Sequence, residues 1–98
     1  MSRSLSSPLM ARTRDILLGE AGDLINKQRE TDYGEASKNF QDIATGWSII
    51  LGTTVDLEDV ALMMAWLKMA RLFKSPNHKD SWVDLIGYAA LGGELSER

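Results

Sequence analysis

Two pairs of acidic residues carry the main chemistry that this sequence could support. Glu58 and Asp59 are adjacent, and Asp80 and Asp84 lie four residues apart, which is about one helical turn. Magnesium in proteins is held by one or two carboxylates together with the phosphate oxygens of a substrate. These four acids are therefore candidate magnesium ligands.

Cationic and phenolic side chains could hold the phosphates of the same substrate. Lys68 and Arg71 lie about 60° apart around a helix that turns by about 100° per residue. Both can neutralise phosphate oxygens, and Tyr88 falls on the same helical stripe as the second acidic pair. The candidate binding residues are Arg29, Tyr33, Lys68, Arg71 and Tyr88. This inventory favours a nucleotide site with magnesium as its cofactor.

Each of these residues also has a structural interpretation. Asp56 with Asp59, and Ser81 with Asp84, have the spacing of a capping box, which satisfies free amides at a helix start. The two cations can instead pair with nearby acids in a partly buried ion network. His78, in a Pro-Asn-His-Lys turn, is more typical of a surface residue than of a ligand. The sequence leaves both interpretations open.

Hydrophobic spacing predicts the helices that position these side chains. Apolar residues recur at helical spacing in four segments, and none of them alternates as a strand would. Ser6 or Ser7 can cap the first helix, turn-forming residues 29–34 separate it from the second, and Gly52 is a suitable stop. The expected helices cover about 8–27, 35–51, 57–74 and 81–95, after a flexible N-terminus at 1–7. The predicted fold is all-α, an antiparallel four-helix bundle in a single domain at 1–98.

The third of these helices is apolar nearly all round. Between Val60 and Phe73 its only charged residues are Lys68 and Arg71. Such a helix must be buried against several neighbours, and its methionines and the three tryptophans of the chain are expected mainly in the core. Because three other helices cannot cover all of this apolar surface, the sequence predicts a homodimer or a larger homo-oligomer.

Composition limits the classes of partner. The net charge of -3 and a pI of about 5.0 argue against duplex nucleic acid, because that binding depends on dense Lys and Arg. The absence of cysteine excludes disulfides and thiolate zinc sites. The longest apolar run, residues 60–67, is far shorter than the roughly 20 residues of a membrane span, and no signal peptide is recognised. We therefore expect a cytoplasmic protein with no membrane partner.

Residues at fixed spacing also carry a family resemblance. The pattern consists of Arg29-x-x-Asp32-Tyr33-Gly34, Glu58-Asp59-Val60-Ala61-Leu62-Met63-Met64, Lys68-x-x-Arg71 and Asp80-Ser81-Trp82-x-Asp84-x-x-Gly87-Tyr88-Ala89. It resembles a family of small proteins encoded by tailed bacteriophages and prophages, over nearly the whole chain after about residue 12. This resemblance implies a location in the cytoplasm of a bacterial host cell, and it implies no particular activity.

The same helices are more distantly similar to the all-α nucleoside triphosphate pyrophosphohydrolases of the MazG and dUTPase type. Those enzymes hold magnesium between acidic pairs on two consecutive helices and cleave between the α and β phosphates. The resemblance implies that Glu58 and Asp59 form the first pair and that Asp80 and Asp84 form the second, with Asp80 and Asp84 as the candidate catalytic residues. In those enzymes the members of the first pair are spaced so that both share a face, whereas here they are adjacent.

Three functions follow from these observations. The first is a magnesium-dependent pyrophosphohydrolase acting on a (deoxy)nucleoside triphosphate. The second is a non-catalytic oligomeric protein that sequesters a nucleotide or a host-defence signalling nucleotide through Arg29, Tyr33, Lys68 and Arg71. The third is a helical module that binds a host protein through residues 29–33.

Overall fold

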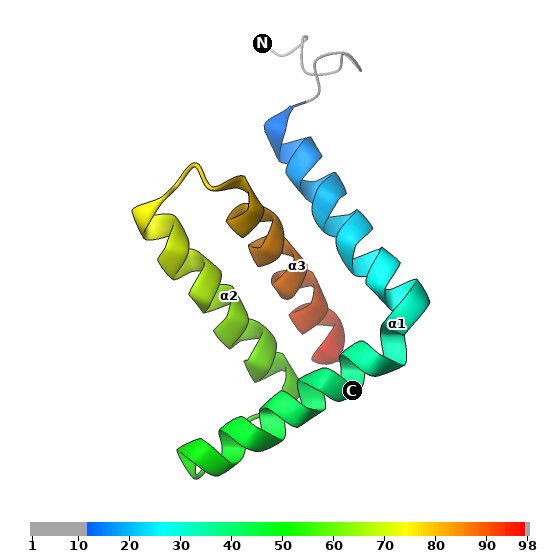
Figure 1. The fold of residues 1–98 in the computed structure, drawn as a ribbon, viewed down its shortest axis with the longest axis vertical. Helices are drawn as coiled ribbons and strands as arrows, with labels where there is room; N and C mark the ends of the chain where they lie inside the picture. The colour runs from blue at the N-terminus through cyan, green and yellow to red at the C-terminus, as the bar shows by residue number, and fades with distance from the viewer. Residues whose placement is uncertain (1–11, 98) are drawn as a thin grey trace.

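The computed structural model describes residues 12–97, without the side chains of residues 27–37. Three helices make up this part of the chain, α1 (Thr13–Leu51), α2 (Leu57–Lys74) and α3 (Lys79–Leu95), and Figure 1 shows their arrangement. Within the described residues no strand is present, so the predicted all-α bundle is confirmed. The expected N-terminal segment 1–7 and the cap at Ser6 or Ser7 lie outside these residues.

The α2 and α3 helices form an antiparallel hairpin, and α1 packs against both of them. The N-terminal part of α1 runs beside α3, while its C-terminal part crosses the end of the hairpin where α2 begins (Figure 1). The most extensive packing is between α2 and α3. The hairpin is therefore the centre of the fold, and α1 encloses it on one side and at one end.

One helix occupies the region in which the sequence predicts two. The backbone is helical across residues 29–34, where a turn was expected. This segment contains one glycine and no proline, and an isolated glycine costs a helix only about 1 kcal/mol, so the sequence does not force a break. The two described parts of α1 nevertheless run in different directions (Figure 1) and take the places of the two predicted helices.

The end of α1 and the connection to α2 are held by short polar contacts. Gly52 adopts the left-handed conformation (φ 71°) that favours glycine, and its N–H donates to the Ser48 carbonyl at 2.9 Å. The Ser48 hydroxyl then accepts a hydrogen bond from the Val55 N–H at 2.8 Å, which seats the Val55 side chain in the core. The predicted stop at Gly52 is confirmed.

The core lies where the C-terminal part of α1 meets the start of α2. Its buried members are Ala44, Val55 and Val60. Partly buried apolar side chains surround them, namely Phe40, Ile43, Trp47, Leu57 and Met64. Burial of these side chains fixes the start of α2 against α1.

Small residues allow α3 to lie close to both neighbours. A Cβ atom added at Gly92 would lie 3.0 Å from the Ala61 Cβ atom of α2. A Cβ atom added at Gly87 would lie 3.4 Å from Ile25 Cγ2 of α1. Close packing of this kind needs residues without a side chain on α3, at least opposite Ala61.

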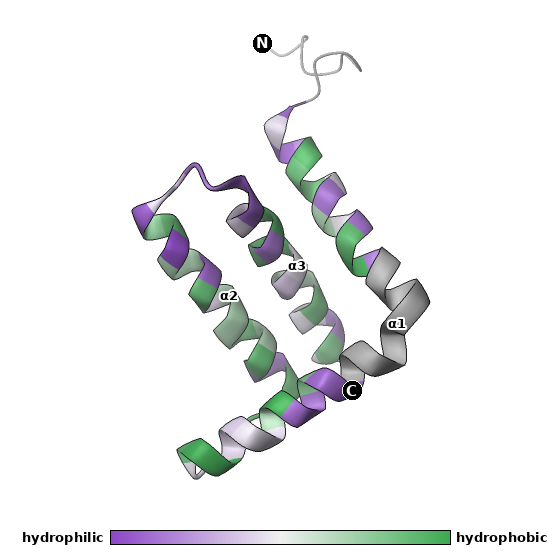
Figure 2. Cartoon of the chain, in the orientation of Figure 1, coloured by the Kyte–Doolittle hydropathy of each residue, from purple (hydrophilic) through white to green (hydrophobic). Residues whose placement is uncertain are grey.

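The expectation that α2 is buried on all sides is wrong for the single chain. Its inner side is buried through Ala61, Ala65 and Leu72, but the side facing away from α3 is open to solvent. We call that side the outer face of α2. It comprises the half-buried Asp59 and the exposed Leu62, Met63, Trp66, Leu67, Ala70, Phe73 and Lys74. Figure 2 shows how much of α2 is apolar.

The tryptophans are accordingly less buried than the sequence predicts. Trp66 on the outer face is 65% exposed and Trp82 on α3 is 40% exposed, whereas Trp47 is half-buried beside the core. The Trp82 indole N–H donates to the Pro76 carbonyl at 2.8 Å and ties α3 to the hairpin turn. Met63 is also exposed rather than buried. In the described part of the chain, no helix has the length and apolar character to cross a membrane.

Candidate functional site

The two acidic pairs lie at opposite ends of the hairpin. Glu58 and Asp59 belong to the first turn of α2, while Asp80 belongs to the first turn of α3, which runs in the other direction (Figure 1). Asp84 pairs with Lys68, which follows Asp59 by nine residues and is thus about 14 Å further along α2. Across the described residues, no group of three or more acidic or histidine side chains could hold a metal ion. One chain therefore does not bring the four predicted magnesium ligands together.

Lys68 and Asp84 form an ion pair between α2 and α3. The Lys68 Nζ atom lies 3.1 Å from Asp84 Oδ2, and the two side chains are 26% and 33% exposed. Each charge offsets the other in a partly buried position. The structural alternative that the sequence left open, an ion pair between these helices, is confirmed for this pair.

Asp59 has a capping role. Its Oδ2 atom accepts a hydrogen bond from the Asp56 N–H at 3.0 Å, and the Asp56 side chain completes the box at the start of α2. The capping interpretation of Asp56 and Asp59 is confirmed. One carboxylate oxygen of Asp59 accepts a backbone hydrogen bond, so the main role of this residue is to stabilise the start of α2.

The start of α3 differs from the predicted Ser81–Asp84 box. His78 is the N-cap, and its Nδ1 atom accepts a hydrogen bond from the Ser81 N–H at 3.2 Å and lies 2.7 Å from the Ser81 hydroxyl. Ser81 is the third residue of α3 and not its N-cap, so it cannot begin a capping box with Asp84, and the Asp84 carboxylate pairs with Lys68 instead. Sequence reasoning missed the role of His78. The available signal was its position directly after the Pro-Asn turn and three residues before Ser81.

Arg71 lies beside this cap at the end of α2. Its Nη2 atom is 3.5 Å from His78 Nε2, and the residue is exposed. Among the described residues, Arg71 forms no ion pair with a carboxylate, in contrast to Lys68. Asp80 is exposed in the first turn of α3, at the same end of the hairpin. Arg71 and Asp80 are the candidate residues that this end leaves accessible.

The remaining candidates are dispersed. Tyr88 is half-buried on α3, two turns beyond Asp80 and away from the hairpin turn. The side chains of Arg29 and Tyr33, and with them the binding site predicted at 29–33, lie outside the described residues. Glu58 is half-buried at the start of α2.

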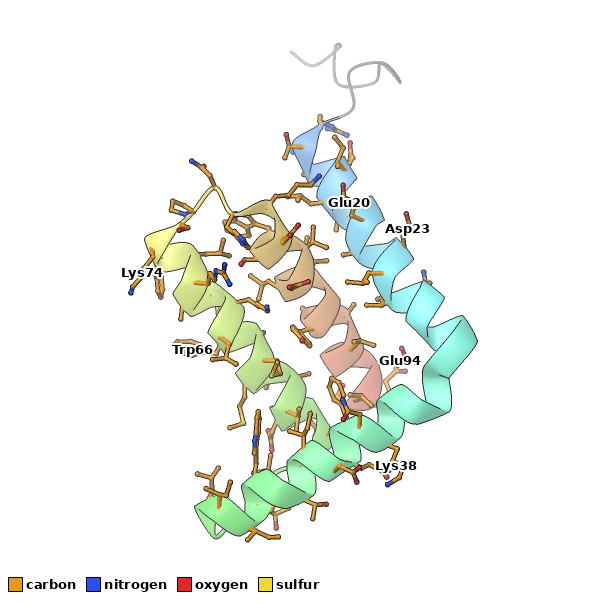
Figure 3. The ribbon with its side chains drawn as sticks, viewed as in Figure 1. Glu20, Asp23, Lys38, Trp66, Lys74 and Glu94 are labelled. Atoms are coloured by element: carbon orange, nitrogen blue, oxygen red, sulfur yellow. The ribbon has the colours of Figure 1, made fainter. Side chains whose placement is uncertain are left out.

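An open groove lies between α1 and α3. It has a volume of about 350 Å³ and is lined by Glu20, Asp23, Leu24 and Val83. Figure 3 shows Glu20 and Asp23 on α1. The lining contains two carboxylates and no cation, so this groove does not suit a phosphate. The charge of Glu20 is partly offset by Lys79, which lies 2.7 Å away outside the lining.

The fold and the site together define a small all-α protein built on an antiparallel hairpin, with capped helix starts and an ion pair between the helices. A family model described as "Domain of unknown function (DUF6378)" matches residues 16–96, and the chain belongs to this family. This match covers the hairpin and nearly all of the described part of α1.

Two curated relatives are phage proteins. The "Gene 55 protein" of Mycobacterium phage L5 is 43% identical over 76 residues, which cover 76% of this chain and 49% of that protein. The "Gene 55 protein" of Mycobacterium phage D29 is 40% identical over 73 residues, which cover 74% of this chain and 48% of that protein. The chain thus spans about half the length of these relatives. No solved structure matches it.

These comparisons confirm the predicted membership of a phage protein family. The more distant similarity to MazG-type pyrophosphohydrolases stays a prediction. The names of the relatives state no activity, so the function has to be argued from the residues.

Proposed function

We propose that the protein binds a phosphate-bearing small molecule, in the first place a nucleotide, at the hairpin end where α2 stops and α3 starts. The observation that supports this proposal is the position of Arg71. Its exposed guanidinium faces His78 instead of a carboxylate, beside the amino end of α3. A helix start favours anions through its free amides and its dipole, and a guanidinium binds phosphate with two parallel hydrogen bonds.

Two further residues at this end of the hairpin suit the rest of a magnesium nucleotide. Asp80 is exposed in the first turn of α3, and magnesium needs only one or two protein carboxylates when phosphate oxygens and waters complete its shell. Trp82 is partly exposed near the hairpin turn, where its indole can stack on a base. His78 positions this end by capping α3.

Binding without catalysis is the form of the proposal that we favour. In one chain the acids at the start of α2 are too far from Asp80 to share a metal ion with it, and Asp84 is neutralised by Lys68. Hydrolysis needs several carboxylates that hold metal and orient water around the same phosphate. A pyrophosphohydrolase would therefore have to assemble its acids from more than one chain.

The binding proposal is tested by measuring the Tm of the protein with each of a panel of nucleotides, in the presence and absence of magnesium. We expect at least one nucleotide to raise the Tm, because a ligand that binds only the folded state stabilises it. Arg71→Ala should weaken that ligand at least tenfold in a direct titration without loss of helicity. The matched control is Lys38→Ala, which removes an exposed cation of α1 that pairs with Asp42. Unchanged affinity in Arg71→Ala would refute the site.

The catalytic alternative has its own measurement. Pure protein is incubated with nucleoside triphosphates and magnesium, and the release of pyrophosphate is followed. Turnover that is lost in Asp84→Asn would favour the enzyme, since this change keeps the shape of the side chain and removes its charge. The absence of pyrophosphate with a nucleotide that raises the Tm would favour sequestration.

A further inference from the structure

We propose that two copies of this chain pair through the outer face of α2, with the two α2 helices antiparallel. This inference does not rest on the ligand site proposed at Arg71. It rests on the exposure of the outer face and on the order of the charges along it.

The outer face presents large apolar side chains to solvent. Leu62 and Trp66 are each 65% exposed and Phe73 is 81% exposed. The three residues lie within about 40° of one another around the helix, so they form one stripe. Figure 3 shows Trp66 on the side of α2 that faces away from α3.

The exposed apolar area of this face is large for a single chain but smaller than a standard interface. A fully covered aromatic side chain buries roughly 150–250 Å², so Trp66 and Phe73 alone expose on the order of 250 Å² at their fractions. With Leu62, Met63 and Leu67 the face reaches several hundred Å², the upper end of what monomers expose. A standard interface covers about 800 Å² on each partner.

The charges on the outer face are complementary to a reversed copy of the same face. Asp59 lies at its beginning and Lys74 lies at its end, about 22 Å further along the helix. The residues of the face between them are apolar. A reversed second copy places each Asp59 beside the Lys74 of its partner, whereas a parallel copy places like charges together. A two-fold axis near Trp66 and Leu67 produces this arrangement, in which both copies use the same patch.

The inner side of α2 cannot serve this purpose, because it is already occupied. Ala61, Ala65 and Leu72 are buried within the chain. A helix that is apolar on both sides needs packing partners on both sides, and the rest of the chain packs only against the inner side of α2. The charge order selects a second copy of the chain as the covering for the other.

The first test measures the mass of the full chain by light scattering between about 1 and 100 µM, the range in which interfaces of modest size associate. We expect twice the chain mass of 10.9 kDa at the upper end. Trp66→Glu should be monomeric, with unchanged helicity because the side chain is exposed. The matched control is Leu18→Glu, an exposed leucine of α1 outside the outer face, which should remain dimeric. A monomeric wild type at 100 µM, or a Trp66→Glu variant with the wild-type mass, would overturn the proposal.

The second test determines the orientation. A carbodiimide joins a carboxylate to an amine only where the two are in contact. Asp59 and Lys74 of one chain are about 22 Å apart, so a cross-link between them can form only between two copies. We expect this cross-link in the wild-type dimer and its loss in Trp66→Glu, which serves as the monomeric reference. A dimer without the Asp59–Lys74 cross-link would overturn the antiparallel arrangement.

Discussion

Two cationic residues of α2, Lys68 and Arg71, differ in whether their charge is paired within the fold or accessible to a ligand. Lys68 and Arg71 are one turn apart on α2, and the sequence treats them as equivalent candidates for phosphate. The structure distinguishes them, because Lys68 reaches Asp84 on α3 and Arg71 lies beside His78. Only the second cation keeps a surface that an anion could reach. A spacing rule places both on one face but cannot say which of them meets a carboxylate on another helix.

The capping role of His78 yields a prediction at the same scale. Replacing an N-cap side chain by alanine typically costs about 1 kcal/mol, because a backbone amide of the first turn loses its acceptor. We expect His78→Ala to lower the free energy of unfolding by about 1 kcal/mol, measured by urea denaturation at a fixed protein concentration. His78→Asn should remain close to the wild type, since asparagine caps helices well. Equal stability of the alanine variant and the wild type would contradict the capping role.

Among the elements, the packing of α3 against α2 depends on one close approach. A Cβ atom at Gly92 would meet the Ala61 Cβ atom at 3.0 Å, whereas a Cβ atom at Gly93 has nothing within 4 Å. Glycine is less favourable than alanine in a helix by up to about 1 kcal/mol. Gly93→Ala should therefore raise the free energy of unfolding by a few tenths of a kcal/mol up to about 1 kcal/mol.

Gly92→Ala should lack this gain and lower the free energy of unfolding, because the neighbouring Cβ belongs to a helix backbone that cannot move aside alone. Thermal or urea denaturation of the two variants, side by side with the wild type, gives the comparison. If Gly92→Ala were stabilised as much as Gly93→Ala, the two helices could not approach as closely as the structure has them.

Local signals explain which elements could be predicted from the sequence. The bounds of α2, the stop at Gly52 and the Asp56–Asp59 box depend on residues close together in the chain, and these agree with the structure. The predicted magnesium site, in contrast, depended on how α2 and α3 are placed relative to each other. Consecutive helices with a short connection run antiparallel, which places Asp59 and Asp80 at opposite ends of the hairpin. The predicted antiparallel bundle was therefore already incompatible with a metal site shared by these two acids within one chain.

The continuity of α1 and the exposure of the outer face could not be predicted in the same way. Polar residues at 29–34 are compatible with both a turn and a helix, and only packing against the hairpin decides between them. The apolar pattern of α2 predicts burial without saying what buries it. Trp66 illustrates the point, because its residue type indicates a core position and the single chain leaves it 65% exposed.

The whole molecule is extended for its length. Its radius of gyration is 16.0 Å, whereas a compact chain of this size has about 13 Å. Figure 1 shows the reason, since the C-terminal part of α1 projects past the hairpin instead of closing over the outer face. A chain of this shape buries less apolar surface than a compact one, and less of its stability comes from its own core. Association would supply the missing burial.

This shortage of burial gives a prediction for the stability of the whole molecule. If a second copy covers the outer face, the folded state is a dimer and the unfolded state is a single chain, so mass action makes the Tm rise with protein concentration. We expect the wild-type Tm to rise measurably between about 1 and 100 µM. The Tm of Trp66→Glu should be lower and independent of concentration, while Leu18→Glu should follow the wild type. A wild-type Tm that is constant over this range would show that the single chain is stable with its outer face uncovered.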